Sequence, residues 1–81
     1  MKVSFIKYEK EENFRIPKLF GMNVEEIKEP EQIDEKIEQL KKQNFTTIII
    51  PNELASFSGN IIRKYKYDNS LNIIIIPSKD K

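Results

Sequence analysis

Two runs of apolar residues dominate the hydropathy pattern of this chain. They are Thr46-Thr47-Ile48-Ile49-Ile50-Pro51 and Asn72-Ile73-Ile74-Ile75-Ile76-Pro77. Runs of β-branched residues without polar alternation are typical of strands covered on both faces, as in a parallel sheet between helices. Because proline cannot donate to a sheet ladder, Pro51 and Pro77 mark where these strands leave the sheet. The pattern therefore predicts two buried parallel strands, and partners or ligands usually dock beyond the carboxyl ends of such strands.

The segment before the first run has the spacing of an amphipathic helix. Pro30 suits a first helical position, and Asn44 suits the end of the helix. Glu38 and Lys42 are placed four residues apart, in the order that favours an ion pair. The apolar stripe comprises Ile33, Ile37 and Leu40.

The segment between the two runs predicts a second helix over about residues 53–65, with Asn52 available to cap its free N–H groups. Gly59 weakens this helix, since glycine costs about 1 kcal/mol against alanine in a helix interior. It either permits close packing or splits the helix in two. Asp68-Asn69-Ser70 has the composition of a turn into the last strand. The apolar positions are Leu54, Phe57, Ile61, Ile62 and Tyr65.

The first third of the chain predicts two further strands with a short helix between them. Val3–Tyr8 is rich in strand formers, and residues 14–20 have apolar spacing with Pro17 in a first helical turn and Gly21 past its end. Residues 22–27 predict an edge strand with Met22, Val24 and Ile27 directed inward. The order β-α-β-α-β-α-β then implies right-handed crossovers and a parallel sheet. We expect a small flavodoxin-like three-layer α/β/α fold, with a four-stranded parallel sheet of order 2-1-3-4 and about three helices.

Length and composition limit the function. At 81 residues the chain is expected to form a single α/β domain over 1–81. It has 14 Lys+Arg and 13 Asp+Glu, a balance that does not favour nucleic acid or an anionic membrane as partner. Cysteine and histidine are both absent, which argues against thiol, zinc and most acid–base chemistry. No cofactor, metal or catalytic residue is expected. The apolar runs are far below the ~20 residues of a membrane span, so we expect a cytoplasmic protein without direct membrane insertion.

Two charged segments have more than one interpretation. The glutamates of Glu9-Lys10-Glu11-Glu12-Asn13 follow the first strand and would lie near the crevice, or they belong to a solvated loop. Tyr65 and Tyr67 with Arg63, Lys64 and Lys66 form a basic–aromatic cluster of a kind enriched in protein interfaces. The same composition occurs in sites for single-stranded nucleic acid and at plain solvated helix ends.

An enzymatic interpretation fails on specific positions. Phosphoacceptor receiver domains share the expected topology, but they need an aspartate at the end of the third strand, where this chain has Pro51 and Asn52. A glycine-rich phosphate loop is also excluded, because Gly21 and Gly59 are the only glycines.

The chain resembles the small F subunits of the V/A-type (vacuolar/archaeal-type) rotary ATPases. The resemblance is most specific over Ile48-Ile49-Ile50-Pro51-Asn52-Glu53-Leu54-Ala55 and over residues 74–80, which include Ile76-Pro77-Ser78-Lys79-Asp80. Phe14-Arg15-Ile16 and Gly21-Met22 are similar to the family's Gly-Phe-Arg-Leu-Ala-Gly segment. Family members continue into a C-terminal helical tail past the position of Lys81. The sequence therefore also fits a divergent relative that keeps the globular domain and lacks this tail.

The resemblance implies a non-catalytic central-stalk subunit with a part in ion transport, proton transport and ATP synthesis. Such a subunit would bind the coiled-coil stalk subunit, aid rotational coupling, and lie peripheral to a membrane-bound ATPase. For Leu54 and Phe57 the alternative is core packing, and for Asn52 it is a helix cap. The interface residues carried over are Asn52, Glu53, Leu54, Phe57, Pro77, Ser78 and Lys79.

A second hypothesis is a stand-alone small protein-binding adaptor domain of the same fold, unrelated to ATPase assembly. The partner, any self-association through a sheet edge, and any regulatory role stay open at this point.

Overall fold

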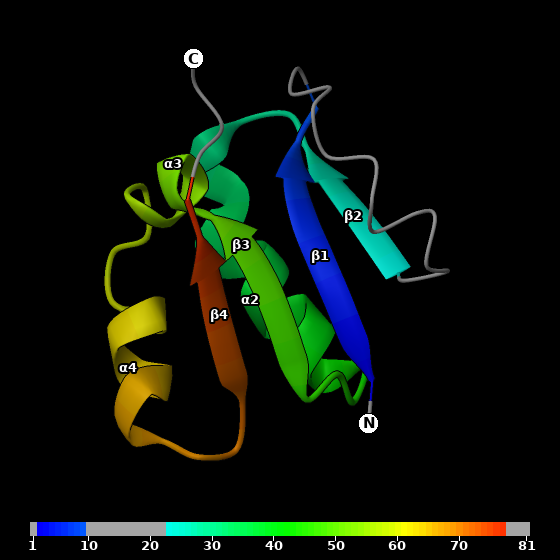
Figure 1. The fold of residues 1–81 in the computed structure, drawn as a ribbon, viewed down its shortest axis with the longest axis vertical. Helices are drawn as coiled ribbons and strands as arrows, with labels where there is room; N and C mark the ends of the chain where they lie inside the picture. Colours follow the sequence, from blue (N-terminus) through cyan, green and yellow to red (C-terminus); the bar gives the residue numbers. More distant parts are fainter. Residues whose placement is uncertain (1, 10–22, 78–81) are drawn as a thin grey trace.

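The computed structural model describes residues 2–9 and 23–77, which form one sheet with helices packed on it (Figure 1). The strands are β1 (Val3–Tyr8), β2 (Asn23–Ile27), β3 (Thr47–Pro51) and β4 (Asn72–Ile76). All pairings are parallel, and the strand order is β2-β1-β3-β4. The predicted sheet and its order are confirmed. The helix expected over 14–20, which would supply the other outer layer, lies outside the described residues, as does Met22.

The described helical segments follow β2 and β3. A 3₁₀ turn, η1 (Pro30–Gln32), leads into α2 (Ile33–Lys42). After β3 come α3 (Asn52–Ala55) and α4 (Ile61–Tyr67). The single helix predicted over 53–65 is therefore two short helices, as the second interpretation of Gly59 allowed.

Both ends of α2 are fixed by local chemistry. Before it, the Glu29 N–H donates to Oε1 of Gln32 at 3.1 Å, which closes the first turn. At its end Asn44 takes a left-handed backbone conformation, with φ 73°. The N–H of Asn44 donates to the Lys41 carbonyl at 3.0 Å, and the N–H of Phe45 donates to the Leu40 carbonyl at 3.1 Å. These bonds make a Schellman motif, which turns the chain into β3.

The hydrophobic core lies between one face of the sheet and the helices. Ile6, Ile48 and Ile50 point to this face, since alternate strand residues share a face and the register aligns Ser4 with Ile48. The predicted stripe of α2 packs on them and is fully buried, with Leu54 and Tyr65 in the same cluster. In Figure 1, α2 lies behind the sheet. Val24 and Ile27, both predicted to point inward, lie on opposite faces, and Ile27 is the one in this core.

The two isoleucine strands differ in burial. In β3, Ile48 and Ile50 are completely buried and Ile49, on the other face, is half-buried. In β4, Ile74 is 42% exposed and Ile75 is 44% exposed. The expectation that both runs are buried is therefore wrong for β4, although the predicted order 2-1-3-4 correctly places this strand at the end of the sheet. The physical reason is its place at the end of the strand order, where the described strands supply a neighbour on one side only.

The Schellman motif gives a direct stability test. Replacing Asn44 by alanine should lower the free energy of unfolding by about 1 kcal/mol, because a Cβ-bearing residue without a local side-chain hydrogen bond disfavours φ > 0. Replacing Asn44 by glycine should preserve or raise stability. Urea unfolding followed by circular dichroism measures both.

The matched control is Gln43→Ala, one residue earlier, where φ is −89° and should change stability little. Equal losses for the alanine variants at 43 and 44 would contradict a conformational origin.

Candidate interaction surface

The rim at the carboxyl ends of β3 and β4 is the candidate surface. Pro51 and Ile76 are register partners, so the residues that follow them, Asn52 and Pro77, leave the sheet side by side, and both are exposed. The helix α3 begins at Asn52 with Pro51 as its N-cap and without a side-chain capping bond. The cap predicted for Asn52 is therefore wrong, since the helix already includes this residue.

The structure separates the two apolar side chains of this rim. Leu54 is 1% exposed and belongs to the core, which confirms the core-packing alternative for this residue. Phe57 is 49% exposed, although its backbone is tied to α3 by an N–H bond to the Leu54 carbonyl at 3.0 Å. Glu53 is half-buried, and its carbonyl accepts a bond from the Ser56 hydroxyl at 2.9 Å. Phe57 is thus the large apolar side chain exposed at the described rim, in addition to the smaller Pro77.

Other predicted rim residues fall partly outside the described residues. Ser78 and Lys79 are outside, and so are Glu11 and Glu12. Glu9 is described, is exposed, and donates its N–H to the Ile27 carbonyl at 2.9 Å.

The break between α3 and α4 is held by an acidic side chain from α2. One oxygen of Asp34 accepts from the Ser58 hydroxyl at 2.6 Å, and the other accepts from the Gly59 N–H at 2.9 Å. The Ser58 oxygen also accepts from the Ile62 N–H at 3.3 Å, in the first turn of α4. A Cβ at Gly59 would meet Asp34 at an ordinary 3.5 Å, so close packing does not explain this glycine. Asp34 therefore fixes where α4 starts.

A second acidic side chain of α2 fixes the far end of α4. The Tyr65 hydroxyl donates to Glu38 at 3.1 Å, and Lys64 lies 3.9 Å from the same carboxylate. The pair expected between Glu38 and Lys42 is therefore wrong, because Glu38 turns toward α4. Lys64 also lies 5.1 Å from the centre of the Tyr65 ring. Asp34 and Glu38 are four residues apart on one helix, so both face the same neighbour.

Burial splits the basic–aromatic cluster. Tyr65 is 5% exposed and is a core residue, whereas Tyr67 is 81% exposed. Burial, followed by the hydrogen bond to Glu38, raises the pKa of Tyr65 above its ordinary 10.0. After α4, the backbone N–H of Ser70 donates to Asp68 at 2.9 Å and holds the pKa of that carboxyl below its usual value. The predicted turn chemistry at Asp68 is thus present.

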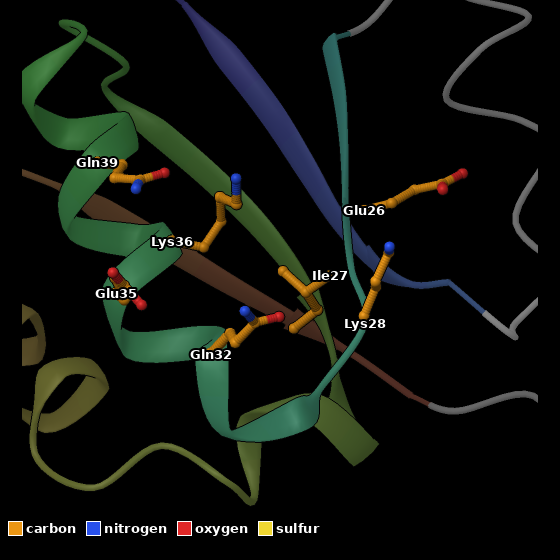
Figure 2. A pocket seen from close by; sticks show the side chains of 7 residues that line it. All are labelled: Glu26, Ile27, Lys28, Gln32, Glu35, Lys36 and Gln39. Carbon is orange, nitrogen blue, oxygen red and sulfur yellow. The ribbon is translucent and has the colours of Figure 1, made fainter.

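A hollow of about 290 Å³ lies between the end of β2 and α2. Figure 2 shows the side chains that line it. Its lining is polar except for Ile27, and its charges balance, with Glu26 and Glu35 against Lys28 and Lys36. Such a lining lacks the apolar surface that holds most small ligands. Over residues 2–9 and 23–77, the side chains make no cluster of acidic residues suited to a metal ion. No helix in that same part of the chain is long and apolar enough to cross a membrane.

Sequence patterns alone did not identify Asp34 and Glu38 as the residues that position α4. The available signal was their i, i+4 spacing beside the apolar stripe, together with a Ser58-Gly59 break opposite.

Truncation variants test the different roles of the two rim residues. Leu54→Ala should lower the free energy of unfolding by about 2–4 kcal/mol, because it leaves a cavity in the core. Phe57→Ala should change it by less than about 0.5 kcal/mol, since the side chain is half exposed. Urea unfolding curves decide this, and a comparable loss for both would show that Phe57 is a core residue.

Tyr65 predicts an alkaline loss of stability. Because folding raises the pKa of Tyr65, the unfolded chain loses the phenol proton at lower pH than the folded protein does. The contribution of the neutral Tyr65 side chain to the free energy of unfolding is therefore complete below pH 10 and falls as the pH rises above 10. Wild type should lose more stability than Tyr65→Phe between pH 9 and pH 11 in urea unfolding. Equal losses would contradict the role given to Tyr65.

A comparison with protein families gives one match that covers most of the chain. The family model described as ATP synthase (F/14-kDa) subunit matches residues 12–81. No curated protein sequence matches significantly. The matched region contains β2, β3, β4 and all the described helices. The chain therefore belongs to the ATP synthase (F/14-kDa) family of subunits.

Proposed function

We propose that this protein is a non-catalytic central-stalk subunit of a V/A-type rotary ATPase. It binds the coiled-coil stalk subunit through the rim formed by α3 and the residue that follows β4, and it aids rotational coupling. It lies on the cytoplasmic side, peripheral to the membrane-bound part of the enzyme, and contributes to ATP synthesis or ion transport through its contacts.

Family membership and one exposed side chain support this proposal. The family model spans residues 12–81 and so includes the whole of the described rim. At that rim Phe57 keeps 49% of its surface exposed, while its neighbour Leu54 anchors α3 in the core. An exposed aromatic ring on a fixed backbone is typical of the residues that contribute most to protein interfaces. Asn52 and Pro77 flank this surface with exposed polar and apolar groups.

The chemistry of the described residues supports a binding role over a catalytic one. The third strand ends at Pro51 and Asn52, where a phosphoacceptor would need an aspartate. Two acidic groups of α2 have structural roles, because Asp34 holds the break before α4 and Glu38 holds Tyr65 of α4. A rigid platform with an exposed apolar anchor is suited to docking another chain.

A binding experiment with matched variants tests the proposal. Purified protein should co-elute with the coiled-coil stalk subunit of the same organism at equimolar ratio. Phe57→Asp should weaken this complex at least about tenfold, because a charge would be buried in the apolar contact. Titration calorimetry measures the dissociation constants.

The matched control is Tyr67→Asp, which makes the same change at an aromatic residue that is 81% exposed at the last position of α4. It should bind like wild type. Circular dichroism shows whether both variants fold. Wild-type protein that fails to bind the stalk subunit would refute the stalk role and favour the adaptor hypothesis.

A further inference from the structure

The outer edge of β4 is uncharged and unpaired in the part of the chain that the structure describes. Within the described residues β4 pairs with β3 alone. The Asn72 N–H donates to the Thr46 carbonyl on the β3 side at 2.9 Å. Because successive strand residues direct their backbone groups to alternate sides, Ile73 and Ile75 direct their N–H and C=O groups to the open side.

The two edges of the sheet are protected to different degrees. The opposite edge strand, β2, carries Glu25 and Glu26, and charged side chains discourage pairing with other chains. The sequence of β4 is Asn followed by four isoleucines, without any charge. It is therefore the edge of this sheet whose strand itself places no charged side chain against an added strand.

A groove runs along this edge on the helix side. In Figure 1, α4 stands beside β4 on the side away from β3. The space between them is a groove of about 540 Å³. Its floor and walls are mainly apolar, and they include Ile62, Leu71 and the side chains of Ile73 and Ile75. The residues with open backbone groups are thus the same residues whose side chains line the groove.

The charge of the groove selects its occupant. Lys66 carries the only charge among the described residues that line it. The helix α4 contains Arg63, Lys64 and Lys66 and no acidic residue, and Lys64 is already paired with Glu38. A second copy of the chain, added about a two-fold axis normal to the sheet, would bring its own basic α4 to the same face. Like charges would then meet, so the groove favours an acidic partner.

We propose that the groove between β4 and α4 binds an extended segment of a partner protein, which adds a fifth strand to the sheet at β4. The segment has branched apolar side chains at alternate positions and at least one Asp or Glu. Its backbone pairs with Ile73 and Ile75, its alternate side chains enter the groove, and its carboxylate meets Lys66. This is the β-augmentation mode, in which backbone bonds give affinity and a groove reads every second side chain.

The free protein gives the first test. Amide hydrogen exchange should be fast at Ile73 and Ile75 and slow at Ile74, whose N–H points to β3. Slow exchange at all three positions in a monomer would mean that the chain covers its own edge and would overturn the proposal. Analytical ultracentrifugation tests self-association of the wild-type protein. A wild-type dimer that becomes monomeric in the Ile75→Lys variant would mean that a second copy occupies the edge, and this result would also overturn the proposal.

The second test identifies the ligand. A phage library of random heptapeptides is selected on wild-type protein and counter-selected on Ile75→Lys. Enriched peptides should alternate branched aliphatic residues and carry an acidic residue. They should bind wild type at least about tenfold more tightly than Ile75→Lys in fluorescence anisotropy, because lysine places a charge in the groove. The proposal would be overturned if the selection enriches no such peptides, or if the enriched peptides bind wild type and Ile75→Lys equally well.

Two matched controls separate the groove from general effects. Ile74→Lys makes the same change at the neighbouring position on the opposite face, which is 42% exposed, and should keep peptide binding. Lys66→Glu should weaken acidic peptides severalfold, whereas Lys42→Glu, with the same change of net charge on α2, should not. Phe57→Asp should leave peptide binding intact, so failure of the stalk role and failure of this site are distinguishable.

Discussion

The packing of α2 against the central strands is the interaction on which the rest of this structure depends. Ile33, Ile37 and Leu40 are fully buried on the isoleucines of β1 and β3. Each such side chain stabilises the fold by about 1.5–3 kcal/mol relative to exposure. The position of α2 therefore determines what its other, polar row of residues can reach.

That polar row places α4. Asp34 holds the break before α4 through hydrogen bonds from Ser58 and Gly59. Glu38 holds the second half of α4 through the hydrogen bond from Tyr65. One face of α2 thus packs in the core, and the adjacent face, which carries Asp34 and Glu38, positions α4. As a result, α4 lies beside β4, and a groove remains between them.

Two surfaces result from this arrangement, and they differ in kind. The rim offers the exposed aromatic side chain of Phe57, which directly follows the short helix anchored by Leu54. The edge of β4 offers backbone groups and alternate isoleucines beside a basic helix. The two surfaces are centred on different residues, Phe57 and Ile75, so a substitution in one surface can leave the other intact.

The sequence by itself determined the elements that depend on local pattern. Consecutive isoleucines identified β3 and β4, the i, i+4, i+7 stripe identified α2, and the family match was visible in the residues around Pro51. Only the tertiary structure decided that Ile74 and Ile75 of β4 stay partly exposed, that Leu54 is buried while Phe57 is exposed, and that Glu38 bonds to Tyr65. The last contact and the one from Asp34 to Ser58 join residues 27 and 24 positions apart. Hydrophobic periodicity reports which side of an element is apolar, whereas contacts of this range depend on how the elements are placed against one another.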